Sequence, residues 1–175
     1  MFLTTHAAAG MAISRYVDDP VAVFCLAFAS HFVLDFIPHG DERLYHDHEW
    51  KVLGRYRRAL LVSFFDILAL VGLILIILRQ TDLPDWQLMN IGILGSVLPD
   101  FLSHLFPVIH RRGSWLFLIR WLYKATKPTG IRYLVRAQNW LHEVLHHEII
   151  RRDIPLSAGI MMQVILVFVF LSFIR

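Results

Sequence analysis

Histidine and aspartate recur in this sequence as pairs four residues apart, and such pairs can bind metal ions. The three pairs are His31 with Asp35, Asp100 with His104, and His142 with His146. Residues i and i+4 of a helix lie on the same face, about one turn apart, so each pair can offer two donors to one ion. Imidazole nitrogen and carboxylate oxygen are ligands that zinc takes in proteins. We therefore predict a metal site whose ligands come from several helices.

Two single residues in apolar surroundings extend the predicted ligand set. His6 lies near the start of an alanine-rich segment, and Asp66 stands alone in a long apolar run that contains no lysine or arginine. A carboxylate in the middle of a membrane helix costs about 2.5–3.5 kcal/mol, so Asp66 needs a partner. The predicted metal ligands are His6, His31, Asp35, Asp66, Asp100, His104, His142 and His146. This number of donors favours two divalent ions about 3.5–4 Å apart, with zinc the first choice and manganese or iron the alternatives.

Other histidines and acidic residues close to these pairs are assigned differently. His39 and Asp41 follow Pro38, which ends a helix, and they either cap the metal site or belong to a loop. At about 100° per residue, His142 and His146 border the apolar face of their helix, whereas His147 points away from it. Four more residues are predicted to be loop residues, namely His46, Asp47, His48 and His110.

The predicted ligands must be positioned by helices, because the apolar residues are clustered in long runs. The chain has 175 residues, of which 57% are hydrophobic, and a mean hydropathy of +0.55. Four runs, 21–37, 59–78, 88–106 and 156–174, come close to the roughly 20 residues that cross a bilayer, and a fifth, 2–17, is shorter. Two amphipathic segments, 115–123 and 132–150, are expected at the interface. We predict an all-α, polytopic membrane helical bundle with four or five membrane helices and two interfacial helices, forming a single domain over 1–175.

Basic residues predict the orientation of this bundle. Lysine and arginine gather in 38–58 and 110–153, and loops rich in these residues stay in the cytoplasm. This orientation brings all the predicted ligands to the cytoplasmic side. Arg111, Arg112 and Arg136 would then flank the site and bind an anionic headgroup. The net charge of +3 thus indicates membrane lipids rather than nucleic acid as the partner, and the oligomeric state is left open.

Short motifs along most of the chain resemble the membrane-bound metal-dependent hydrolases of bacteria and archaea, which are small inner-membrane proteins. The motifs are Thr4-Thr5-His6 through Gly10, Ser30-His31 through Asp35 and Pro38-His39, Leu98-Pro99-Asp100, and Leu141-His142 through His147. The resemblance implies a metal-dependent hydrolase in the prokaryotic plasma membrane and marks as matching positions His6, His31, Asp35, Asp100 and His142. The His-x-x-x-Asp spacing is also similar to that of zinc-dependent phospholipases C and P1-type nucleases, which act on phosphate esters.

Metal ligands, a lipid setting and basic flanks together predict hydrolysis of a phosphate ester or pyrophosphate of a lipid. Bound metal would lower the pKa of a water molecule, and Asp66 or Asp35 would orient that water as the general base. The alternative is a divalent-metal transporter or carrier, because such proteins also use His/Asp pairs within helices. The sequence contains no glycine-rich phosphate loop, nucleophile elbow or H-E-x-x-H motif, so the enzyme classes that depend on them are not expected.

The helical positions of His142 and His147 lead to a first prediction. Replacing His142 by alanine should remove bound metal from the purified protein, whereas His147→Ala should leave the metal content unchanged, because only His142 borders the apolar face. Elemental analysis of the two variants measures this contrast. Equal metal loss in both variants would show that the wrong face of this helix has been assigned to the site.

Overall fold

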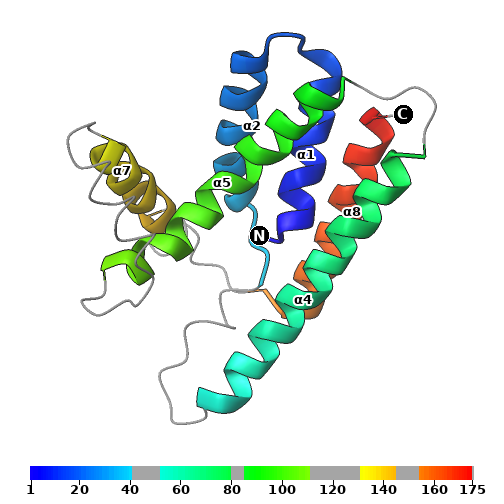
Figure 1. Ribbon diagram of the computed structural model, residues 1–175. Coiled ribbons are helices and arrows are strands. Elements are labelled where there is room, and N and C mark those ends of the chain that lie inside the picture. Colours follow the sequence, from blue (N-terminus) through cyan, green and yellow to red (C-terminus); the bar gives the residue numbers. More distant parts are fainter. Residues whose placement is uncertain (41–51, 80–84, 111–130, 145–153, 175) are drawn as a thin grey trace.

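The structure is a computed structural model that describes residues 1–40, 52–79, 85–110, 131–144 and 154–174 (Figure 1). All regular secondary structure within these ranges is helical, which confirms the all-α prediction. The helices are α1 (Leu3–Tyr16), α2 (Pro20–Asp35), α4 (Val52–Ile77), α5 (Trp86–His110), α7 (Ile131–Val144) and α8 (Leu156–Ile174). The amphipathic segment predicted at 115–123 lies outside the described residues.

The predicted number of membrane helices is wrong. Within the described ranges, only α8 is both long and apolar enough to cross a membrane, so four or five membrane helices in a polytopic bundle are not found. Helix α1 has 14 residues and α2 has 16. At 1.5 Å per residue they extend over about 21 and 24 Å, less than the roughly 30 Å of a hydrocarbon core. The apolar part of α4, Leu61–Ile77, is also too short.

Helix α5 is the element against which α1, α2 and α7 pack (Figure 1). Helix α1 lies between α5 on one side and α8 and α4 on the other. An apolar cluster joins four of these helices, with Ala8 and Met11 of α1, Leu73 and Ile77 of α4, Met89 of α5 and Ile174 of α8 all buried. Burial of this cluster fixes α1 in the centre of the assembly, where its alanine-rich sequence leaves room for close neighbours.

Glycines allow the backbones of α1 and α5 to touch. A Cβ atom at Gly10 would overlap with the carbonyl group of Gly92, and a Cβ at Gly92 would overlap with that of Gly10. One turn further along α5, a Cβ at Gly95 would lie 2.8 Å from the carbonyl oxygen of Phe24 in α2. The absence of side chains at these positions therefore lets α1 and α2 approach α5 more closely than alanine would permit.

Helix α2 begins and ends at positions that its sequence specifies. Its N-cap, Asp19, accepts a hydrogen bond of 2.7 Å from the backbone N–H of Ala22, and Pro20 occupies the first turn. Both features favour a helix start. The helix ends at Asp35, three residues before Pro38. His31 and Asp35 thus belong to the last turn of a well-defined helix.

The glycine contact between α1 and α5 leads to a second prediction. Gly10→Ala should lower the free energy of unfolding by about 1–3 kcal/mol, because the added methyl group must push α1 away from α5. Gly72→Ala is the matched control, since a Cβ at Gly72 meets no atom within 4 Å. Alanine there should stabilise α4 by up to about 1 kcal/mol. Thermal unfolding of both variants provides the comparison, and similar melting temperatures for the two would contradict the close helix contact.

Candidate metal centre

His31 presents one ring nitrogen to two carboxylates. Its Nδ1 atom lies 2.8 Å from the backbone carbonyl oxygen of Ser96 in α5. A carbonyl oxygen can only accept, so Nδ1 carries the hydrogen and Nε2 has the lone pair in the neutral ring. That Nε2 atom lies 3.0 Å from Oδ2 of Asp35 and 3.7 Å from Oδ1 of Asp100. Acceptor atoms facing one another at this distance require a cation between them, which is either a proton on the ring or a metal ion.

His6 of α1 lies against His31 and faces the same carboxylates. The two imidazole rings are stacked, with centroids 4.1 Å apart and an angle of 24° between their planes. The Nε2 atom of His6 is 3.3 Å from Oδ1 of Asp35 and 3.9 Å from Oδ2 of Asp100. Neither ring nitrogen of His6 makes a hydrogen bond within the described part of the chain. The ring is thus buried with its donor atoms available to an ion.

Burial keeps His6 neutral at physiological pH. Removal of the ring from water lowers the pKa of His6 from 6.5 to about 4, and the nearby imidazole of His31 also lowers it. The carboxylate of Asp35 acts in the opposite direction but offsets only part of this effect. A metal ion binds the neutral imidazole, so His6 is in its ligand form at neutral pH without loss of a proton.

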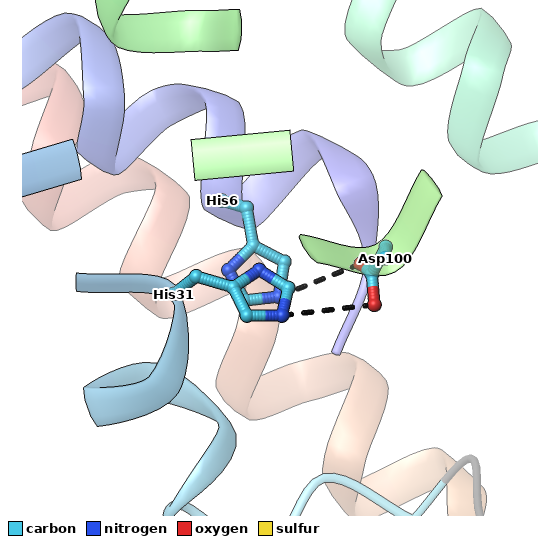
Figure 2. A group of neighbouring side chains, drawn as sticks. All are labelled: His6, His31 and Asp100. Atoms are coloured by element: carbon cyan, nitrogen blue, oxygen red, sulfur yellow. Dashed lines mark ion pairs between the residues drawn. The ribbon is translucent and has the colours of Figure 1, made fainter. Parts of the chain in front are cut away.

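The spacing of these donors suits a tetrahedral metal ion. His6, His31 and Asp100 each offer a ligand atom, and these atoms all lie within 4.8 Å of one another (Figure 2). With bonds of about 2.0–2.1 Å, ligand atoms around a tetrahedral ion are about 3.3–3.4 Å apart. The Nε2 atoms of His31 and His6 lie 3.7 and 3.9 Å from oxygens of Asp100, somewhat above this value, and 3.0 and 3.3 Å from oxygens of Asp35. His6, His31 and Asp100 therefore form a group that could hold a metal ion, with Asp35 beside it.

Access to the site is from the side of Asp100. The side chains of His6, His31 and Asp35 are fully buried, whereas that of Asp100 is 13% exposed. Next to Asp100, Gln138 of α7 donates hydrogen bonds to the carbonyl oxygen of Pro99, at 3.2 Å, and to Oγ of Ser103, at 3.1 Å. Helix α7 is thereby attached to α5 at the turn that carries Asp100.

His39 and Met1 border the site on the side of Asp35. The α-amino group of Met1 donates to Oδ1 of Asp35 at 3.2 Å and lies 2.9 Å from Nε2 of His39. Nδ1 of His39 donates to the carbonyl oxygen of Ile37 at 2.8 Å, so Nε2 accepts. His39 therefore lies in the segment after α2, outside any helix, and its side chain, 1% exposed, also borders the site, so both sequence alternatives describe it in part.

Asp66 has a different environment from the one that the sequence suggested. Its carboxylate accepts hydrogen bonds from the backbone N–H groups of Leu3 and Thr4, at 2.8 and 3.2 Å, and from the hydroxyl group of Thr4, at 2.6 Å. Both oxygens are thus bound to the first turn of α1. The structure does not group Asp66 with His6, His31 and Asp100, and its contacts do not support the predicted roles of ligand and general base.

The other predicted site residues fall into two groups. His104 belongs to α5 and His142 to α7, but their side chains are outside the described part of the structure, as are the whole residues His146, Arg111, Arg112 and Asp41. Arg136 is described, and it is exposed on α7. The pairing of His31 with Asp35 and the approach of His6 and Asp100 are thus the parts of the predicted set that the structure brings together.

Comparison with known proteins adds no relative. The sequence matches no protein-family model, and we find no significant similarity to a curated protein or to a solved structure. The resemblance to membrane-bound metal-dependent hydrolases therefore stays a prediction from the short motifs.

The sequence reasoning missed two residues that hold the site in place. One is Ser96, whose backbone carbonyl orients His31, and no side-chain pattern could reveal a backbone contact. The other is Gln163, which is 1% exposed in α8 and accepts a hydrogen bond of 2.7 Å from the N–H of Phe2. A lone polar residue within the apolar run 156–174 was a usable signal for such a contact.

The low pKa of His6 leads to a third prediction, for the metal-free protein. The unfolded chain takes up a proton on His6 near pH 6.5, whereas the folded protein does so only near pH 4. His6 therefore lowers the free energy of unfolding as the pH falls through this window, by up to about 3 kcal/mol. Denaturant unfolding at several pH values should show a smaller pH dependence in His6→Gln than in the natural sequence. An identical pH dependence would contradict a buried, neutral His6.

Proposed function

We propose that the protein is a membrane-associated, metal-dependent hydrolase that acts on a phosphate ester or pyrophosphate of a lipid. The observation that carries this proposal is the buried set of two imidazoles and two carboxylates, with nitrogen–oxygen separations of 3.0–3.9 Å. A cation stabilises such a set; the α-amino group of Met1 lies 3.2 Å from Oδ1 of Asp35, and we assign the place between the imidazoles and Asp100 to a metal ion. Zinc is the ion that the donor types favour, with manganese or iron as alternatives.

Each residue of the site has a definite part in this proposal. His6, His31 and Asp100 would bind the ion, which leaves one tetrahedral position for water, and Asp35, 3.0 Å from Nε2 of His31, would orient that water. A divalent ion in such a site supplies a Lewis acid for the phosphoryl oxygen and a water molecule of lowered pKa. The carbonyl oxygen of Ser96 holds the His31 ring so that Nε2 faces the ion. A second ion would need further ligands, for which the sequence offers His104, His142 and His146.

Partial exposure of Asp100 supports a catalytic rather than a purely structural ion. Structural zinc sites are closed by protein ligands, whereas catalytic sites keep one position accessible to water or substrate. Asp100 is the ligand with an exposed edge, at 13%, so water and a phosphate group would approach from its side. Arg136 lies on α7, which is attached to α5 beside Asp100, and arginine is well suited to an anionic headgroup.

A link between α1 and the candidate membrane helix supports a lipid substrate. Gln163 of α8 binds the backbone of Phe2, four residues before His6. The outer face of α8 carries large apolar side chains, among them Met161, Ile165 and Phe168, which are 64, 55 and 67% exposed. In a membrane these side chains would contact acyl chains, and the bond between Gln163 and Phe2 would attach α1, which carries His6, to that helix. The basic segments 38–58 and 110–153 favour a site that faces the cytoplasm, and the resemblance implies the plasma membrane of a prokaryote.

The test of this proposal, our fourth prediction, compares variants of the purified protein in detergent. The natural sequence should retain a divalent metal and release inorganic phosphate from phosphatidic acid or an isoprenoid diphosphate. His31→Ala and Asp100→Asn should lose the metal and at least 100-fold in activity, because each removes a ligand. His48→Ala is the control, a histidine for which the sequence predicts no role in the site.

Two results would count against the proposal. Phosphate release that survives in His31→Ala would place the activity elsewhere. Metal binding without phosphate release, together with metal uptake into sealed vesicles that depends on His31, would favour the transporter alternative instead.

A further inference from the structure

The first turn of α1 is held by residues of other helices. Its N-cap residue, Phe2, makes no side-chain cap hydrogen bond. The N–H group of Phe2 instead donates to Gln163 of α8, and those of Leu3 and Thr4 donate to Asp66 of α4. Helices normally satisfy these first N–H groups with their own cap residue or with water. The start of α1 is thus fixed relative to two neighbouring helices.

Asp66 makes the larger share of these bonds. It accepts from Leu3 at 2.8 Å, from the N–H of Thr4 at 3.2 Å and from the hydroxyl group of Thr4 at 2.6 Å, while the Thr4 hydroxyl also lies 2.9 Å from the carbonyl oxygen of Asp66. Asp66 is 8% exposed and Thr4 equally so. A carboxylate buried in this way is stabilised by the N–H groups and the positive end of the helix, and it holds them at fixed distances in return.

Two other aspartates cap helices but do not fix a helix relative to its neighbours. Asp19 accepts from Ala22 of its own helix α2, and Asp85 accepts from Gln87 and Leu88 of its own helix α5. Both aspartates are exposed. Because donor and acceptor belong to one segment, these caps favour helix formation but do not set the position of the helix against its neighbours. Asp66 differs because its partners lie more than 60 positions away in the chain.

Because Asp66 fixes the first turn of α1, it also affects the position of His6, which follows Thr4 by two residues. The Nε2 atom of His6 lies 3.3 Å from Oδ1 of Asp35, so the place of the ring is determined by the backbone of α1, by stacking on His31 and by this contact. We propose that Asp66 is a positioning residue that sets the depth and rotation of α1 and thereby directs His6 at the metal site. This inference rests on the proposed function of that site and assigns Asp66 a role other than that of ligand.

The experiment, our fifth prediction, uses Co²⁺ as a coloured probe of the metal site in the purified full chain. Asp66→Asn should weaken Co²⁺ binding by about 10- to 100-fold and shift the visible absorption bands, because the amide cannot accept at both oxygen positions and His6 moves. Asp85→Asn makes the same chemical change at an exposed, local cap and should alter neither. Thr4→Val, which removes one donor to Asp66, should weaken Co²⁺ binding and shift the absorption bands in the same direction as Asp66→Asn, but by a smaller amount.

The outcomes separate this inference from the proposed function. If Asp66→Asn folds and keeps the Co²⁺ affinity and absorption spectrum of the natural sequence, the positioning role is overturned. If Asp66→Asn does not fold, an unchanged spectrum in Thr4→Val overturns it instead. If the natural sequence binds no Co²⁺, the metal proposal fails, and the imidazole ¹⁵N signals of the metal-free protein decide the positioning role. A shift of the His6 signals in Asp66→Asn but not in Asp85→Asn supports it, and unchanged signals in both overturn it.

Discussion

The contact between the backbones of α1 and α5 is the constraint on which the site depends. Gly10 and Gly92 meet where any side chain would overlap with the opposite backbone. His6 precedes Gly10 by one helical turn, and Asp100 follows Gly92 by about two, so each functional side chain shares a helix face with the glycine of its own helix. The close approach therefore places an imidazole of α1 and a carboxylate of α5 at the same spot. Helix α2, which packs on α5 at Gly95, adds His31 and Asp35 from a third direction.

This arrangement brings imidazole nitrogens and carboxylate oxygens close together, and their lone pairs and negative charges repel one another unless a cation lies between them. Ser96 determines which nitrogen of His31 faces the carboxylates, and burial lowers the pKa of His6, so the His6 ring offers a lone pair to the site at neutral pH. Proteins seldom bury two carboxylates together without balancing cations, and the α-amino group of Met1 supplies one positive charge beside Asp35. The bonds that Asp66 and Gln163 make to the first turn of α1 show how neighbouring helices keep this set in place.

Much of the site could be predicted from residue spacing, whereas the number of membrane helices could not. The interval between His31 and Asp35 is a property of any helix, so their contact needed only a correct helix assignment. The sequence indicated that Asp66 needs a partner, but an isolated carboxylate in an apolar run does not show which one, and here the structure gives the start of α1. The membrane helices were overestimated because apolar runs a few residues short of the roughly 20 that cross a bilayer were counted as near spans. Helices α1 and α2 follow those runs closely and have only 14 and 16 residues. The glycine contact and the carbonyl of Ser96 are tertiary features without a sequence signal of their own.

X-ray absorption spectroscopy of the zinc-loaded protein tests most directly whether one ion binds the residues that α1, α2 and α5 bring together. A tetrahedral set of nitrogen and oxygen ligands at about 2.0–2.1 Å is expected. The outer-shell scattering should correspond to two imidazole rings in the natural sequence and to one ring in His6→Ala. A sulfur ligand at about 2.3 Å would contradict this result, because it would place the ion at Cys25, the exposed cysteine of α2. A spectrum without imidazole scattering would likewise show that His6 and His31 do not bind the metal.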